Sequence, residues 1–217
     1  MFALNIIQAN GDDKKSQVGG GAWLPESFDW PLSSDGETMR PLLTINQDIF
    51  ILPTIPEDMA VTVFSPVDLK STNTIKETRN CAINDEQQKN LADQKGMVVY
   101  LHHREKKERL KNNVSSYPKA MLLRRDLTDA ELKEDLTDDI NGIYISKVLG
   151  RPAWLQDEIF FPPSFEFCVQ ITEQDLIKNN KGYDGIFRGG SCYLFLRRNL
   201  KKLESGSIAG TCFIQFT

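Results

Sequence analysis

The chain has 217 residues, a formal net charge of −4 and 40% hydrophobic residues. These values are typical of one large or two small folded domains, and they exclude a disordered, collagen-like or coiled-coil chain. The charge is too small and of the wrong sign for binding nucleic acid by bulk electrostatics. The only histidines are His102 and His103, so the sequence also disfavours most histidine-dependent acid–base and zinc chemistry.

Short apolar stretches bounded by Gly, Pro, Asn and Asp predict a chain made mainly of strands. In chain order, the predicted strands are 2–7, 42–45, 60–64, 97–102, 121–123, 142–145, 165–171, 191–196 and 212–216. One short helix is predicted after Thr128, with Glu131 three residues later as in a capping box. A second is predicted over 173–178 with Thr172 as its cap, and 84–93 is polar enough for a surface helix or a loop. We therefore expect an α+β fold that is rich in β-strands.

The termini and cysteines bear on the compartment. The apolar start of the chain has no basic region before it and soon becomes polar, so we expect neither a signal peptide nor a membrane span. The four cysteines, Cys81, Cys168, Cys192 and Cys212, are far apart and form no C-x-x-C pair, which argues against a metal site or a disulfide framework. We expect a cytoplasmic protein that has no cofactor or metal and binds no membrane.

Residues 101–140 are densely charged, with nine basic and nine acidic residues. The basic run 104–111 is interrupted by Glu105 and Glu108 and contains no aromatic residue, so we expect no nucleic-acid partner. The acidic run that follows is usually a solvated helix face, and its functional interpretation is a surface that binds a basic protein. Its members are Asp129, Glu131, Glu134, Asp135, Asp138 and Asp139.

Charge is also uneven between the ends of the chain. Residues 1–60 carry nine acids against three bases, whereas residues 181–203 carry six bases against one acid. Either the two regions attract each other in the fold, or they form two faces that attract partners of opposite charge.

A sequence pattern recurs in the two halves of the chain. A β-branched residue and a glycine precede Ala22-Trp23-Leu24 and Ala153-Trp154-Leu155, and a proline-bearing loop and an apolar strand follow each triplet. The two strands end at Ile45 and Ile171. We therefore expect one domain over 1–217, a pseudo-duplicated antiparallel sheet with a few short helices. Its related halves would be about 1–100 and 141–217, joined by the charged segment 101–140.

The same residues carry a resemblance to a known family. Gly19-Gly20, Leu24-Pro25, Trp30-Pro31 and Pro41-Leu42-Leu43 resemble the N-terminal signature of the YwqG-like family of bacterial proteins. The segments that resemble its second half are 150–156, 167–171, 189–195 and 210–215. The chain departs from the family at Gly21-Ala22 and Thr44-Ile45-Asn46. The resemblance implies a mostly-β, pseudo-duplicated cytoplasmic domain with no catalytic residues to carry over. Because relatives are expected to be encoded beside toxins, it also suggests an immunity role.

Candidate chemical groups are few. Adjacent residues of a strand point to opposite faces, so His102 and His103 cannot jointly bind one ion, and we expect them at an exposed strand end. The glycine runs 19–21 and 189–190 are interpreted as tight turns, because neither is followed by the Lys-Ser/Thr of a phosphate-binding loop. Trp23, Trp30 and Trp154, with Asp29, either belong to the core or line a cleft between the halves.

Two main hypotheses follow. The first is a non-catalytic binding protein, specifically an immunity protein that neutralises a cognate toxin effector by covering its active site. The alternative is a small-ligand-binding protein or cryptic enzyme that uses the tryptophan-lined cleft. A scaffold with an unrelated partner is a third possibility, and the sequence sets no oligomeric state.

Overall fold

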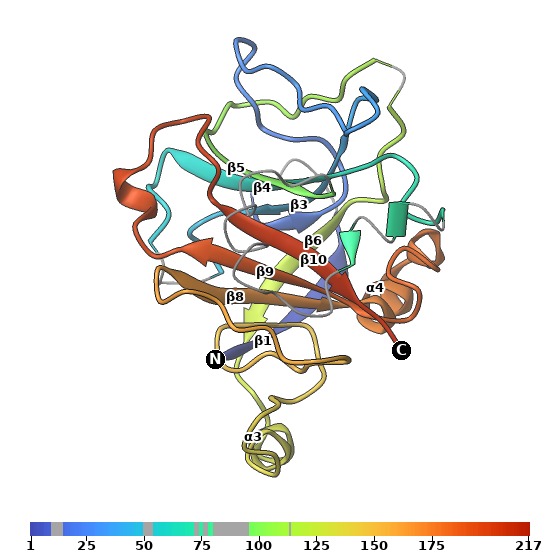
Figure 1. Cartoon of the computed structure of the whole chain (residues 1–217), viewed down its shortest axis with the longest axis vertical. Helices are drawn as coiled ribbons and strands as arrows, with labels where there is room; N and C mark the ends of the chain where they lie inside the picture. The colour runs from blue at the N-terminus through green and yellow to red at the C-terminus, as the bar shows by residue number, and fades with distance from the viewer. Residues whose placement is uncertain (10–14, 50–53, 72–73, 76–77, 80–95, 113) are drawn as a thin grey trace.

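A computed structural model describes residues 1–9, 15–49, 54–71, 74–75, 78–79, 96–112 and 114–217. Within these residues, ten strands form one antiparallel sheet, accompanied by two short helices (Figure 1). The strands are β1 (Phe2–Gln8), β2 (Gln17–Val18), β3 (Arg40–Ile45), β4 (Met59–Ser65), β5 (Val98–His103), β6 (Ala120–Arg125), β7 (Lys147–Val148), β8 (Phe165–Thr172), β9 (Ser191–Arg197) and β10 (Gly210–Gln215). The helices are α3 (Asp129–Asp135) and α4 (Glu173–Asn179), and two 3-10 turns are η2 (Lys181–Tyr183) and η3 (Leu200–Lys202). The predicted strand-rich α+β fold is confirmed.

The sheet curls until its two ends nearly meet. Its strand order is β10-β9-β8-β7-β1-β6-β2-β3-β4-β5. At the ends, β5 exchanges backbone hydrogen bonds with the residues that lead into β10: Leu101 N–H donates to Ser207 at 3.0 Å, and Ala209 N–H donates to Val99 at 2.9 Å. These bonds satisfy backbone groups that an open edge would leave exposed. In the part of the chain that is described, no helix has the length and apolar run needed to cross a bilayer.

The strand order shows an exchange at the centre of the sheet. Strand β1 pairs with β6 and β7, whereas β6 pairs with β1 and β2. The first five strands and the last five therefore form two sets, and each set contributes its first strand to the other. Strand β6 comes from the charged segment 101–140. In chain order it is the first strand of the second set, as β1 is the first strand of the first set.

Matching backbone geometry recurs in the two sets. After β2, Gly19 and Gly20 have φ of +67° and +72°, and after β7, Leu149 and Gly150 have φ of +60° and +84°. The N–H of Gly19 donates to Leu42 at 2.8 Å, and the N–H of Leu149 donates to Cys168 at 2.9 Å. Both acceptors lie where the strand register shifts, so each turn is fastened to a β-bulge in the next long strand.

A serine–aspartate contact also recurs. The backbone N–H of Ser16 donates to Asp48 at 3.1 Å, and that of Ser146 donates to Asp175 at 2.9 Å. Each serine hydroxyl in turn accepts a backbone N–H from the residue that follows Ile45 or Ile171. The recurrent sequence pattern therefore coincides with recurrent hydrogen bonds.

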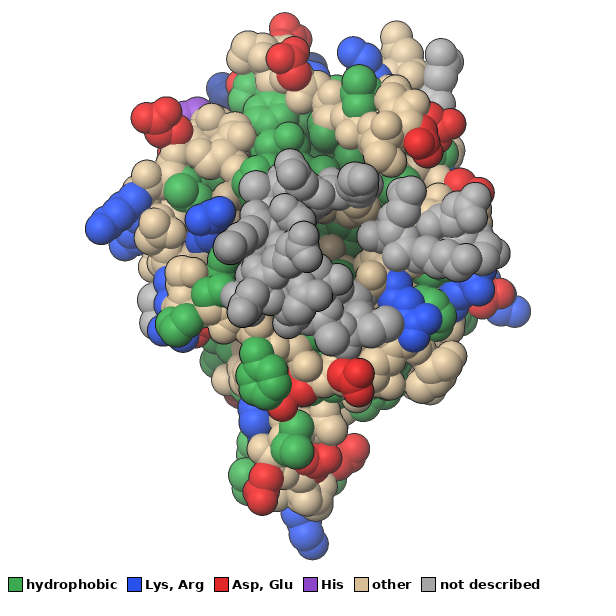
Figure 2. Space-filling view, in the orientation of Figure 1, with side chains coloured by type: hydrophobic (Ala, Val, Ile, Leu, Met, Phe, Trp, Pro, Cys, Tyr) green, Lys and Arg blue, Asp and Glu red, His purple; other side chains and the backbone are tan. Residues whose placement is uncertain are grey.

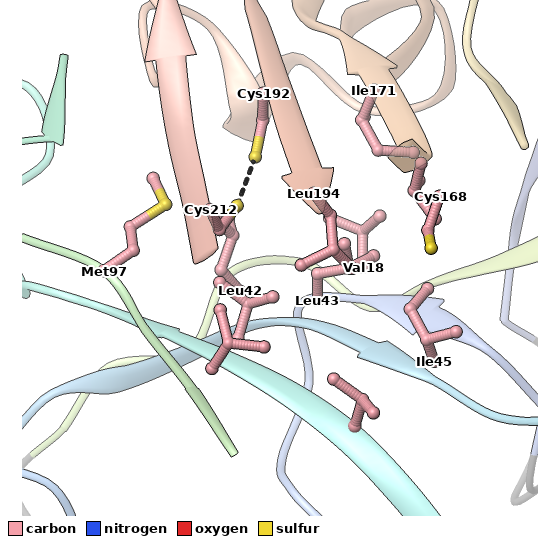
Figure 3. Packing of buried hydrophobic residues seen from close by; sticks show 14 of the residues in the cluster. Val18, Leu42, Leu43, Ile45, Met97, Cys168, Ile171, Cys192, Leu194 and Cys212 are labelled. Atoms are coloured by element: carbon pink, nitrogen blue, oxygen red, sulfur yellow. Dashed lines mark hydrogen bonds between the residues drawn. The ribbon is translucent and has the colours of Figure 1, made fainter. Parts of the chain in front are cut away.

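The inner face of the sheet forms the main core, and residues of both sets meet there (Figure 3). Leu42, Leu43 and Ile45 of β3 point toward Leu194 and Ile171 of the second set. These side chains are at most 2% exposed, and truncating one such core residue to alanine typically costs about 2–5 kcal/mol.

The outer faces of the sheet carry two smaller aromatic clusters. The first-set cluster includes Trp30, Met39 and Phe64, with Phe28 and Tyr100 packed against it. The second-set cluster consists of Ile159, Phe167, Tyr193, Phe195 and Phe213, with Trp154, Phe161 and Phe165 packed against it. Loops cover both faces, so aromatic residues of long strands are buried although they lie outside the main core.

The strand expected at 142–145 is wrong. The N–H groups of Gly142 and Ile143 donate to Pro152 and to the Asp135 carboxylate, so they are not available to a neighbouring strand, and the short strand β7 begins later. The segment 84–93 lies outside the described residues.

Gly19→Ala is predicted to destabilise the fold by about 3 kcal/mol, because alanine disfavours positive φ and its Cβ would overlap the carbonyl oxygen of Pro118. Gly36→Ala is the matched control: Gly36 has φ +79° but nothing within 4 Å of the added Cβ, so about 1 kcal/mol is expected. Urea unfolding of the three proteins measures the difference. Equal losses in the two variants would contradict the tight contact.

Candidate functional site

Helix α3 projects from one end of the molecule (Figure 1). The Thr128 hydroxyl accepts the backbone N–H of Glu131 at 3.3 Å, and the Glu131 carboxylate accepts the N–H of Thr128 at 2.8 Å. This predicted capping box is confirmed, and it satisfies N–H groups that the first turn of a helix leaves unpaired.

Charged contacts, rather than apolar packing, attach α3 to the sheet. No residue of α3 is buried. Arg125 of β6 contacts the Glu131 carboxylate through two nitrogens, at 2.7 and 2.6 Å. Asp135 lies 3.5 Å from the Arg151 guanidinium. The hydrogen bond from Arg125 is the main reason that the pKa of Glu131 falls to about 2, so this carboxylate stays charged at neutral pH.

A fully buried lysine lies beneath this attachment. The ammonium of Lys147 donates to the carbonyl of Ile143 at 2.7 Å and lies 4.0 Å from Asp135. Burial lowers the pKa of Lys147 to about 8, because loss of water disfavours the charged form more than Asp135 stabilises it. The corresponding residue of the first set is Gln17, an uncharged side chain that donates to two glycine carbonyls.

Three large apolar side chains face solvent on and just after α3. Leu132, Leu136 and Ile140 are 47%, 78% and 60% exposed. Leu132 lies in α3, Leu136 is its C-cap and Ile140 lies in the non-helical segment that follows. We call residues 129–140 the acidic projection. Figure 2 shows apolar and acidic side chains together at this end of the molecule. A group of exposed apolar residues bordered by charges is typical of a surface that binds another protein.

A pocket of about 660 Å³ opens beside the acidic projection and shares Asp139 and Ile140 with it. We call it the aromatic pocket. Its aromatic lining consists of Trp154, Phe160, Phe161, Phe165, Phe167 and Phe195.

Trp154, Phe161 and Phe195 are nearly parallel to their stacked neighbours in and beneath this pocket. The ring of Phe161 stacks on Phe195 with centroids 3.9 Å apart and 18° between the planes. Trp154 stacks on Tyr193 at 5.3 Å and lies 10° from the plane of Phe195. Trp154, Phe161 and Phe165 are half-buried, so their rings border the free space and offer it an apolar, π-rich wall.

The structure uses the six predicted acidic residues in two ways. Glu131 and Asp135 hold α3 to the sheet, as described above. Asp129, Glu134 and Asp139 are exposed. Asp138 is also exposed, and its carboxylate accepts the N–H groups of Asn141 and Ile140, which lower its pKa.

The residues of the predicted cleft are distributed over two clusters. Trp30 belongs to the first-set cluster and donates its indole N–H to Met39 at 2.6 Å, whereas Trp154 belongs to the second-set cluster. Trp23 is fully buried. Asp29 is exposed. The aromatic pocket contains Trp154 but not Trp30.

The two histidines point to opposite faces of β5, as predicted, but the expected exposed strand end is wrong for His102. His102 is fully buried and donates from Nδ1 to the carbonyl of His103 at 2.8 Å. Its Nε2 therefore accepts from the Thr62 hydroxyl, also at 2.8 Å. Burial is the main cause that lowers the pKa of His102 to about 4. His103 is exposed, with Nδ1 3.0 Å from Asp58.

The glycine runs are turns whose N–H groups are already engaged. Gly20 donates to Tyr117 and Gly190 to Phe187, at 3.1 and 2.9 Å. Among the described residues, Cys168, Cys192 and Cys212 are free thiols, and no three potential ligands gather at a metal site. Cys81 lies outside those residues.

Sequence reasoning missed the exposure of the acidic projection's apolar residues and the aromatic pocket. The spacing of Leu132, Leu136 and Ile140 within an otherwise charged segment was the available signal. The run Phe160-Phe161-Pro162-Pro163 also pointed to a loop rich in aromatic rings.

No model of a protein family matches the chain, and no curated protein matches it. The resemblance to the YwqG-like family therefore stays a prediction.

Acid is predicted to destabilise the protein through His102. Its pKa is about 4 in the folded state against about 6.5 in the unfolded state, so the unfolded chain binds a proton first as the pH falls. About 3 kcal/mol should be lost between pH 6.5 and 4. Urea unfolding should show this loss for the wild type and for His103→Gln, but not for His102→Gln; a full loss in His102→Gln would contradict it.

Alkali should relieve the cost of burying Lys147. The charged form is disfavoured in the folded state, so stability should rise as the pH increases from about 8 to 10.5, by up to about 3 kcal/mol. Lys147→Gln, which copies the residue of the first set, should lose this rise, whereas the exposed Lys133→Gln should keep it. Denaturant midpoints at pH 7 and 10 would measure this rise in stability. If the wild type and both variants gained the same stability, deprotonation of Lys147 would not be its cause.

Proposed function

We propose that this chain is a non-catalytic cytoplasmic binding protein, and specifically an immunity protein for a toxin effector. It would bind a basic surface of the effector through the acidic projection and cover the effector's active site.

The observation that carries this proposal is the group of exposed apolar side chains on and just after α3. A short helix normally turns its leucines toward the core, but Leu132 and Leu136 face solvent while acidic residues attach the helix to the sheet. A partner that covers Leu132, Leu136 and Ile140 would remove their apolar surface from water, which favours association.

Charge supports a basic partner. Residues 126–140 contain seven acidic residues and one lysine, and Arg125 and Arg151 neutralise only Glu131 and Asp135. The remaining carboxylates would attract a basic surface, raise the association rate and select against acidic partners. Fast association suits an inhibitor that must bind its toxin before the toxin reaches its target.

A small-ligand-binding protein is the second candidate. The aromatic pocket favours it, because Trp154 lines a space large enough for a small molecule. All of the described lining belongs to the second set and the segment before β7, so such a ligand would occupy one set rather than a cleft between the halves.

The proposal predicts that a gene beside the gene for this chain encodes a toxin effector, and the test uses that effector. Cells that make the effector should grow only when this chain is also made. The purified pair should bind directly, and binding should weaken as salt is added. The double variant Leu132→Ser/Leu136→Ser should raise the dissociation constant at least tenfold, because it removes two central apolar contacts.

Leu32→Ser is the matched control, since Leu32 is also a leucine with 59% exposure but lies outside the acidic projection. It should leave binding and protection unchanged. Circular dichroism and urea unfolding should show that the variants keep the fold. Lack of direct binding at about micromolar concentration together with lack of protection would refute the proposal.

A further inference from the structure

The aromatic pocket combines flat apolar walls with a charged rim. Trp154, Phe161 and Phe165 border the space, and Asp139 and Glu158 are among the carboxylates that line it. We propose that this pocket binds a guanidinium group. A second step rests on the proposed function above: the guanidinium belongs to an arginine side chain of the basic partner.

The charges at the rim favour a cation. The two arginines that line the pocket already have partners: Arg151 donates to the backbone carbonyl of Asp138 at 2.6 Å and lies near Asp135, and Arg198 lies 3.8 Å from Glu166. Asp139 and Glu158 make no ion pair with any described residue. An incoming cation would therefore find two carboxylates that no arginine of the pocket neutralises.

The rings favour a planar cation over a compact one. A guanidinium is flat, weakly hydrated and able to stack on an aromatic face while its N–H groups bind carboxylates. One ring of this cluster already lies under a guanidinium within the chain, since that of Arg197 is 5.3 Å from the centroid of Phe165. A lysine ammonium would gain the charge attraction but not the stacking.

Comparison of the two sets supports the same ligand. In the first-set cluster, Arg109 lies over the ring of Trp30 at 5.9 Å and also donates to the carbonyl of Pro25. In the second set, no arginine of the described residues lies over Trp154, and the aromatic pocket opens beside that ring. The first set thus shows within this fold how an arginine covers a tryptophan of the outer cluster.

The pocket is also placed to act together with the acidic projection. Asp139 and Ile140 belong to both, so a partner that covers Leu136 and Ile140 would have its neighbouring side chains within reach of the pocket. An arginine inserted there would be a desolvated, central contact, the kind that dominates binding energy in protein interfaces.

The experiment uses the purified full chain labelled with 5-fluorotryptophan, whose three ¹⁹F signals are assigned from single Trp→Phe variants. The probes are the peptides Gly-Gly-Arg-Gly-Gly, Gly-Gly-Lys-Gly-Gly and Gly-Gly-citrulline-Gly-Gly. The arginine peptide should shift the Trp154 signal and leave Trp23 and Trp30 unmoved. The lysine peptide should bind at least fivefold more weakly, and the neutral citrulline peptide should not bind.

The double variant Asp139→Asn/Glu158→Gln should weaken binding of the arginine peptide about tenfold. Asp157→Asn is the matched control, because Asp157 is an exposed neighbour that does not line the pocket; it should bind like the wild type. The inference is overturned if Trp154 does not respond at about 10 mM arginine peptide, if citrulline binds as well as arginine, or if the double variant binds normally.

These outcomes separate this inference from the proposed function. Effector protection without a Trp154 response would overturn the arginine pocket and leave the immunity role standing. A Trp154 response without effector protection would refute the immunity role and show that the pocket takes a guanidinium from another source, such as a free small molecule.

Discussion

The six residue pairs that join β1 to β6 lie at the centre of the sheet. On its other side, β1 pairs with the short strand β7 of the second set, and β6 pairs with the short strand β2 of the first. Neither set is a continuous sheet without the other, because β6 separates β1 from β2. The inner core follows from this arrangement, since Leu42, Leu43 and Ile45 of the first set pack against Ile171 and Leu194 of the second. Two loosely joined domains would not require this mutual contact.

The two outer faces of the sheet differ in the residues that cover them. In the first set, Trp30 and Phe64 pack together in the outer cluster, and the chain's own Arg109 lies over Trp30. In the second set, the covering loop leaves the aromatic pocket, and α3 is held nearby by ion pairs. The turns after β2 and β7 and the serine–aspartate hydrogen bonds are thus the same in both sets. The loops differ in sequence, and this changes the residues that each outer face exposes to solvent.

The sequence predicted most long strands and both helix starts, because apolar stretches and caps such as Thr128 are local signals. It failed at 142–145, where an apolar stretch gives its N–H groups to a loop and a carboxylate instead of a strand. It also failed for His102, since burial there depends on Phe28 and Thr62 from distant segments. Trp23 and Trp154 looked equivalent in the sequence, but tertiary structure buries Trp23 completely and leaves Trp154 half-buried at the wall of a pocket.

The strand exchange has a consequence for how the chain is made. Synthesis proceeds from the N-terminus, yet β1 finds its partners only at 120–125 and 147–148. The backbone groups of β1 must therefore stay unpaired until residues 120–125 have been made, and an apolar strand in that state can pair with other chains. Efficient production of this protein should thus depend on chaperones that shield β1 during synthesis, however stable the finished sheet is.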